Sequence, residues 1–113
     1  MLTPDIITGD DVSIPIELTK GGATFVIDPG ATVQAAVTAR KHKNDAGDVY
    51  ITAQPVTEVV GSDWPNSLLV VEFTSAQTAA INRNGDATLE IQVDDGGKLT
   101  WLVPITIRQG TIT

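Results

Sequence analysis

The residues of this chain that could do chemistry are few, and their spacing does not form a catalytic set. Enzymes that transfer or hydrolyse groups need a nucleophile with a base, a pair of acids or a bound metal ion. The chain has one histidine and no cysteine. His42 lies in the basic run Arg40–Lys43, which holds no carboxylate to orient its imidazole, so we interpret this run as a solvated loop. We therefore expect the protein not to be an enzyme.

The acidic residues and the glycines are explained by turns rather than by a metal or phosphate site. Aspartates pair at Asp10–Asp11 and Asp94–Asp95. Calcium takes about six to eight oxygen ligands, and the segment Asn82–Asp86 has neither the spacing of a calcium loop nor its closing glutamate. None of the serines, at positions 13, 62, 67 and 75, stands in a nucleophile motif. The glycine pairs 21–22 and 96–97 are typical of hairpin turns, and we expect no metal and no cofactor.

The composition favours one small domain without nucleic-acid or membrane partners. A chain of 113 residues is long enough for one two-layer core. Its net charge of −7 argues against a nucleic-acid surface, which needs a basic face to replace phosphate counterions. Met1–Asp5 lacks the features of a signal peptide, and no segment approaches the roughly 20 apolar residues that span a bilayer.

Residues 67–94 form the most regular stretch, and the strands and the helix expected there must position any site. Apolar and polar residues alternate in 67–74 and again in 87–94, which is the period of a half-buried strand. Between them we expect a short helix over 75–81, with Thr74 as N-cap and Gln77 at the third helical position, the two residues of a capping box. Such a helix turns the chain from one sheet to the other.

The remaining segments predict an all-β fold. Pro15 places its strand at an edge or a bulge, and Pro55 interrupts another. We expect a single domain over 1–113, an immunoglobulin-like β-sandwich of about seven or eight strands with one short helix; a small β-barrel is the alternative. Residues 1–11 are expected to form an N-terminal arm and 110–113 a short tail. The further strands are expected at residues 12–19, 24–27, 32–40, 49–60 and 99–107.

Four apolar residues stand on the strand face that a sandwich exposes to water. They alternate out of phase with the buried series of their own strands. Either the helix or a loop covers them, or they belong to a subunit interface. These interface candidates are Leu68, Val70, Leu102 and Pro104.

The basic run and a tryptophan are the other interface candidates. Arg40, Lys41 and Lys43 are three of the seven Lys and Arg residues, and the rest of the chain carries four positive and fourteen negative charges. Such a dipolar molecule can dock its basic loop against an acidic patch of a neighbour, although most such loops face water. Trp64 lies in a polar loop and is expected to be exposed, whereas Trp101 lies in mid-strand and is expected in the core.

Short motifs follow one another along nearly the whole chain, and Phe73–Ile81 carries the most weight among them. In this order they resemble a small immunoglobulin-like β-sandwich domain of tailed-bacteriophage virion proteins, as in N-terminal domains of baseplate and tail proteins. The other motifs are Ile7–Asp11, Lys20–Gly22, Ile27–Gly30, Thr32–Ala36, Gly85–Leu89 and Val103–Gly110.

The resemblance implies a non-enzymatic structural protein of a phage particle. Its place would be the tail, the baseplate, an adaptor or a head decoration, and it would dock to other phage structural proteins and form a homo-oligomer. It would be made in the host cytoplasm and end in the virion. The alternative is a solitary immunoglobulin-like binding module that recognises a carbohydrate or a host protein through its loops, with Trp64 as the exposed anchor.

Overall fold

A computed structural model describes residues 4–28, 30–39, 47–81 and 84–109 of the chain. Most of these residues lie in strands, which confirms the all-β class predicted from the sequence. The strands are β1 (Asp5–Ile7), β2 (Val12–Glu17), β3 (Thr19–Lys20), β4 (Ala23–Thr24), β5 (Thr32–Thr38), β6 (Val49–Val56), β7 (Leu68–Phe73), β8 (Gly85–Asp94) and β9 (Lys98–Arg108). The helical segments are the 3-10 turn η1 (Trp64–Asn66) and the helix α1 (Ser75–Ala79).

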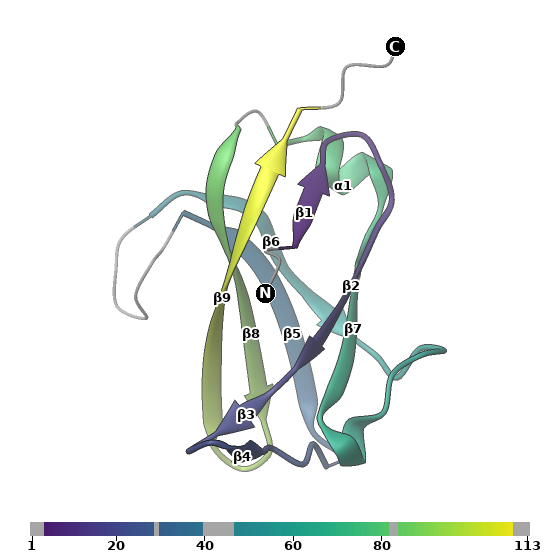
Figure 1. Ribbon diagram of the computed structural model, residues 1–113, viewed down its shortest axis with the longest axis vertical. Coiled ribbons are helices and arrows are strands. Elements are labelled where there is room, and N and C mark those ends of the chain that lie inside the picture. Colours follow the sequence, from purple (N-terminus) through teal and green to yellow (C-terminus); the bar gives the residue numbers. More distant parts are fainter. Residues whose placement is uncertain (1–3, 29, 40–46, 82–83, 110–113) are drawn as a thin grey trace.

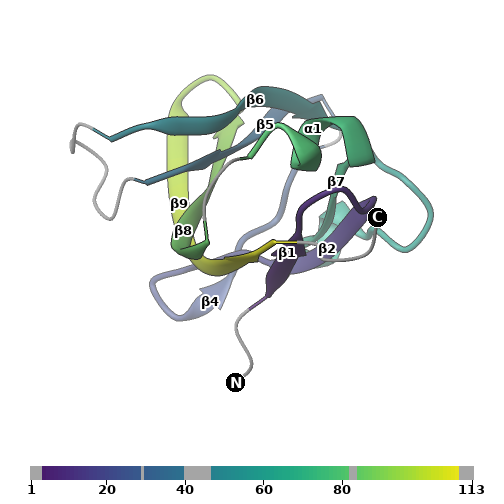
Figure 2. The same cartoon turned by 90° about the horizontal axis from the view of Figure 1, so that it is seen from above.

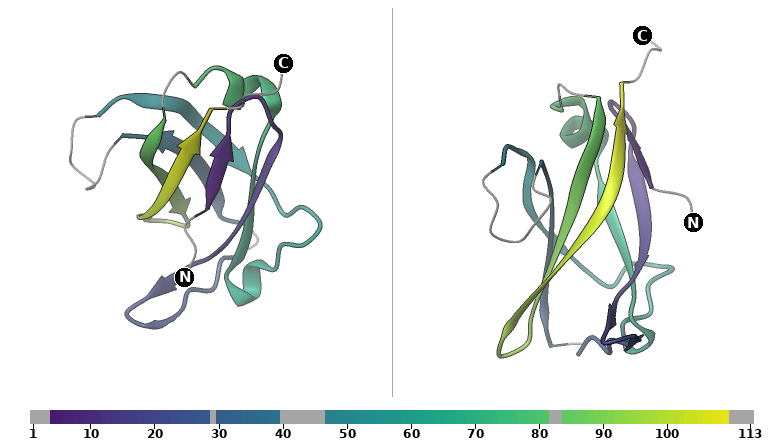
Figure 3. Two further views of the ribbon diagram at one scale, coloured as in Figure 1. Left: turned by 45° about the horizontal axis from the view of Figure 1, so that its top comes forward. Right: turned by 60° about the vertical axis from the view of Figure 1, so that its left-hand side comes forward.

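Two sheets enclose the core. A five-stranded sheet has the order β1-β9-β8-β5-β6, and a two-stranded sheet pairs β2 with β7. The hairpin of β3 and β4 lies at one end of the molecule beside the β8–β9 turn, and α1 lies at the other end (Figure 1). Seen from above, the five-stranded sheet curls around the interior towards the layer of β2 and β7 (Figure 2). Figure 3 gives two further views of this arrangement.

The core is aliphatic and comes from the alternating residues of both sheets. Leu69 and Val71 of β7 belong to the same buried cluster as Leu89, Ile91 and Val93 of β8. The alternation predicted for these two strands is therefore confirmed. Burial of each such side chain contributes about 1.5–3 kcal/mol, so this cluster is the main source of stability.

The N-terminal segment is a strand in part, and the expectation of an arm over residues 1–11 is wrong for residues 5–7. β1 pairs in parallel with β9, with Ile6 opposite Ile107. Ile6 is fully buried. Three residues are too few for an alternation pattern to be recognised in the sequence. The expected tail at 110–113 lies outside the described residues.

Two of the three prolines in the described strands, Pro15 and Pro55, lie on edge strands, whereas Pro104 lies in β9. Pro15 belongs to β2, whose partner is β7, and Pro55 belongs to β6, whose partner is β5. An edge strand needs the backbone N–H groups of only one side, so a proline is tolerated there. The edge position predicted for Pro15 is confirmed, and Pro55 lies within β6 instead of interrupting it. β6 ends at Val56, and β4 ends at Thr24, both before the predicted ends.

The corner between β7 and β8 has the predicted cap. The backbone N–H of Gln77 donates to Oγ1 of Thr74 at 3.3 Å, and the backbone N–H of Thr74 donates to Oε1 of Gln77 at 2.8 Å. This capping box satisfies two backbone donors at the start of α1. In addition, the backbone N–H of Ser75 donates to Oδ1 of Asp11 at 2.7 Å, which fixes the helix start to the turn before β2.

Candidate functional site

The outer face of the five-stranded sheet presents rows of side chains that run across β5, β8 and β9. Antiparallel register places each row, since residues opposite one another point to the same face. The first row is polar, the second is mixed, and the third ends in a proline. The rows are Gln34, Gln92 and Thr100, then Ala36, Glu90 and Leu102, then Thr38, Thr88 and Pro104.

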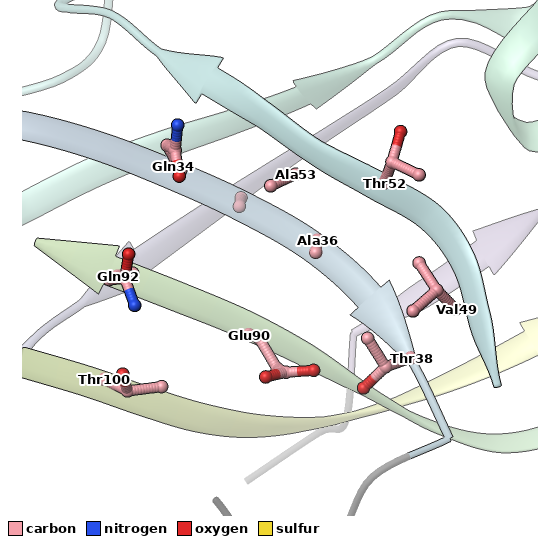
Figure 4. Close-up of a pocket in the computed structure, with 10 residues that line it drawn as sticks. Gln34, Ala36, Thr38, Val49, Thr52, Ala53, Glu90, Gln92 and Thr100 are labelled. Carbon is pink, nitrogen blue, oxygen red and sulfur yellow. The ribbon is translucent and has the colours of Figure 1, made fainter. Parts of the chain in front are cut away.

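A half-open hollow of about 380 Å³ lies over the first two rows, and we call it the polar hollow. Its volume is at the lower end of the range of ligand pockets. Amide, carboxylate and hydroxyl groups border it, from strands that are neighbours in the sheet (Figure 4). The polar residues that line it are Gln34, Thr38, Thr52, Glu90, Gln92 and Thr100.

The polar hollow exists because small side chains and a bulge coincide. Ala35 pairs with Gln54 and Val37 pairs with Ile51, so two residues of β6 stand opposite the single residue Ala36. A bulge of this kind bends its strand and increases the local twist. The residues at the bulge, Ala36 on β5 and Ala53 on β6, have only a methyl group to fill the space between the longer side chains around them.

A second hollow, of about 380 Å³, lies on the same face, and we call it the β9 hollow. Leu102 and Pro104, two of the predicted interface residues, line it together with Ala39, Asp86 and Thr106. Leu102 is half-buried and Pro104 is exposed. Both therefore present apolar surface on the outer face.

The other predicted pair lies on the outer face of the opposite sheet. Leu68 and Val70 of β7 stand opposite Glu17 and Pro15 of β2, and both are half-buried. The loop before η1 packs beside them: a side chain built at Gly61 would come within 3.8 Å of Cγ2 of Val70. This loop also carries Val60, which is fully exposed.

We call Val60, Leu68 and Val70 the β7 patch. A loop covers part of Val70 but leaves a large apolar side chain, that of Val60, entirely in water. The loop therefore covers part of this pair, as one of the two alternatives from the sequence has it, and the subunit interface stays a prediction. The β7 patch and the β9 hollow lie on opposite outer faces of the molecule.

The expected exposure of the two tryptophans is wrong. Trp64 is only 4% exposed and belongs to the core cluster, so it is not an exposed anchor. Trp101 is half-buried: its ring centroid lies 4.9 Å from that of Phe25, and its Nε1–H donates to the carbonyl oxygen of Thr19 at 2.8 Å. Trp101 thus packs against the edge of the core cluster and bonds to β3, the first strand of the β3–β4 hairpin.

Local contacts explain the serines near β7. The hydroxyl group of the fully buried Ser67 donates to the carbonyl oxygen of Leu18, and that of Ser62 donates to the carbonyl oxygen of Val59 at 2.5 Å.

In the described part of the chain, no three His, Cys, Asp or Glu residues come together as metal ligands do. No described helix has the length and hydropathy to cross a bilayer. The basic candidates Arg40, Lys41 and Lys43, and His42 with them, lie outside the described residues.

Comparison with known proteins does not assign a family. No protein-family model matches the chain, and no curated protein sequence matches it. Function must therefore be argued from the chain's own surfaces.

Proposed function

We propose that this chain is a non-enzymatic structural subunit of a bacteriophage particle that acts by docking to other virion subunits. The tail, the baseplate, an adaptor and the head surface are the possible places. The observation that supports this most is apolar surface on both outer faces, in the β7 patch and in the β9 hollow. A subunit with a contact site on each face can bind two neighbours at once, as a ring or lattice requires.

The energetics favour assembly through many copies over a tight isolated pair. Full burial of a valine or leucine side chain contributes about 1.5–3 kcal/mol, and the residues of the β7 patch other than Val60 are already half-buried. Association costs at least about 4 kcal/mol in lost freedom of motion. One such patch is therefore weak alone, whereas repeated contacts on a symmetric particle add up through effective concentration.

The order of the strands supports the immunoglobulin-like description and, with it, the resemblance to phage domains. In variable-type immunoglobulin domains one sheet includes strands G, F, C and C′, and strands B and E belong to the other. The order β9-β8-β5-β6, together with the pair β2-β7, fits this arrangement in both sheets. The short helix α1 then occupies the corner between strands E and F.

Purified particles of the phage that encodes the chain provide the test. Mass spectrometry of gradient-purified virions should detect the chain at a fixed ratio to the major structural proteins. Labelled antibodies against it should mark one region of the particle in electron micrographs. Absence of the chain from purified virions, while it is present in infected cells, would overturn the proposal.

A further inference from the structure

The polar hollow carries a set of groups that the docking proposal does not use. Gln34 of β5 and Gln92 of β8 are cross-strand partners, and Thr100 of β9 continues their row. Glu90 lies two residues before Gln92 on the same face of β8, and it is half-buried. Figure 4 shows these side chains on neighbouring strands around Ala36. From this arrangement we propose that the polar hollow binds an uncharged carbohydrate.

The hydrogen-bonding groups of the hollow match those of a sugar. Each glutamine amide offers donors and an acceptor, and the hydroxyl group of Thr100 offers both. Sugar hydroxyl groups also donate and accept, so several can be satisfied at once along the row of Gln34, Gln92 and Thr100. The methyl groups of Ala36 and Ala53 leave room for the C–H face of a ring to lie against the sheet.

Other small ligands fit the same lining poorly. Its described residues include no Lys, Arg or His to bind a phosphate or another anion. One carboxylate is too few for a calcium ion, which takes about six to eight oxygen ligands. An apolar ligand could contact the alanine and valine side chains of the lining, but it would cover the amide groups of Gln34 and Gln92 without offering them hydrogen bonds.

The inference does not rest on the virion proposal. Thr38 lines the polar hollow, and its cross-strand partner Thr88 lines the β9 hollow. The two hollows are therefore neighbours on one face but have different linings.

A ligand in an open hollow without an aromatic side chain to stack on depends on hydrogen bonds that compete with water. We therefore expect weak binding, with a Kd on the order of 1 mM for one oligosaccharide, which repeated copies would strengthen.

Titration of the isotope-labelled protein with neutral oligosaccharides, followed by NMR, tests the inference. The probes are the hexasaccharides of the malto, cello, manno and chito series, with an anionic oligogalacturonate as the comparison. The result expected is a saturable shift of the side-chain amide signals of Gln34 and Gln92 with at least one neutral probe. The anionic probe should leave these signals unchanged.

Variants connect the shifts to the hollow. Gln34→Ala and Gln92→Ala should each weaken binding about two- to tenfold, the effect of one lost hydrogen bond. Ala36→Leu should abolish binding by filling the space. Gln109→Ala is the matched control, because Gln109 is exposed beyond the end of β9 and does not line the hollow. Circular dichroism and the backbone NMR spectrum establish that each variant is folded, and the two glutamine variants decide if Ala36→Leu is not.

Three results would overturn the inference. The first is no response of the hollow to any neutral probe. The second is a Kd that stays the same in Gln34→Ala and Gln92→Ala. The third is a hollow that responds to raised concentration of the protein itself or to a purified virion subunit but to no sugar, which would make it a protein-docking surface.

Discussion

The hydroxyl group of Thr78 in α1 donates a hydrogen bond of 2.8 Å to the backbone carbonyl oxygen of Asp10. The hydroxyl oxygen of Thr78 also accepts a bond of 3.0 Å from the backbone N–H of Gly9. Thr78 is fully buried. The corner helix is thereby tied to the turn between β1 and β2, which crosses from one sheet to the other, so the two crossings stabilise each other.

Replacement of Thr78 by valine tests this tie. Thr78→Val keeps the shape of the side chain but removes both hydrogen bonds, so it should lower the free energy of unfolding by about 1–3 kcal/mol. Thr57→Val is the matched control: Thr57 is exposed after β6, and its replacement should change stability by less than about 0.5 kcal/mol. Urea melts measure both variants, and equal midpoints would contradict the expectation.

Loss of the capping box at Thr74 should lower the free energy of unfolding by less than the loss of the Thr78 hydrogen bonds. Thr74 is exposed, and its side chain accepts from the backbone N–H of Gln77. Thr74→Ala should cost about 1 kcal/mol, and Thr74→Ser should cost much less because it retains the oxygen atom. Thermal melts of the two variants compare them directly. Similar losses for serine and alanine would mean that the methyl group, not the cap, supplies the stability.

Ser67 combines a buried hydrogen bond with a left-handed backbone. Its φ is 68°, and its hydroxyl group donates to the carbonyl oxygen of Leu18. Ser67→Ala and Ser67→Gly both lose this bond, which should cost about 1–3 kcal/mol in alanine. Glycine adopts positive φ without strain, so Ser67→Gly should be more stable than Ser67→Ala by about 1 kcal/mol. Denaturant melts in which alanine equals or exceeds glycine would contradict this account.

Local chemistry was predictable from the sequence, whereas long-range placement was not. Thr74 and Gln77 are three residues apart and need no distant partner, so the capping box was predicted correctly. Trp64 stands between Asp63 and Pro65, which indicates a loop, but η1 turns its side chain into the core. The backbone N–H of Ile27, which donates to the carbonyl oxygen of Trp64 at 3.1 Å, helps to hold this turn from a distant segment.

The polar hollow could not be predicted for the same reason. Gln34 and Gln92 are 58 positions apart in the numbering, and only the register of β5 against β8 brings them into one row. The bulge opposite Ala36 depends on the pairing of β6, which alternation in a single strand does not reveal. Leu68, Val70, Leu102 and Pro104 could be singled out, because each is out of phase within its own strand.

The tryptophans should differ in solvent access, in the order opposite to that expected from the sequence. Trp64→Phe leaves Trp101, which is half-buried, and Trp101→Phe leaves Trp64, which is 4% exposed. Acrylamide should therefore quench the fluorescence of Trp64→Phe more strongly than that of Trp101→Phe. Equal quenching of the two folded variants would contradict the placement of η1 against the core.

Val60, in the β7 patch, is the residue at which docking can be tested without loss of stability. Because this side chain is fully exposed, Val60→Asp should leave the free energy of unfolding unchanged while it adds a charge to the β7 patch. Desolvation of an unpaired carboxylate at an apolar contact is strongly unfavourable, so the variant should not enter particles when it competes with the wild-type chain. Val26→Asp is the matched control, because Val26 is an exposed valine, at 62%, outside the β7 patch and both hollows.

A second variant separates the two faces. Leu102→Ser changes the β9 hollow on the opposite face, where a side chain that is only half-buried should tolerate the change without unfolding. If the β7 patch of one copy contacts the β9 hollow of the next copy, Val60→Asp and Leu102→Ser should each reduce incorporation into particles, and a mixture of the two should form complementary pairs that do not extend. Competition during infection, quantified by mass spectrometry of purified virions, measures this. Wild-type incorporation of Val60→Asp would remove the β7 patch from the proposal, and wild-type incorporation of both variants would refute docking through these faces.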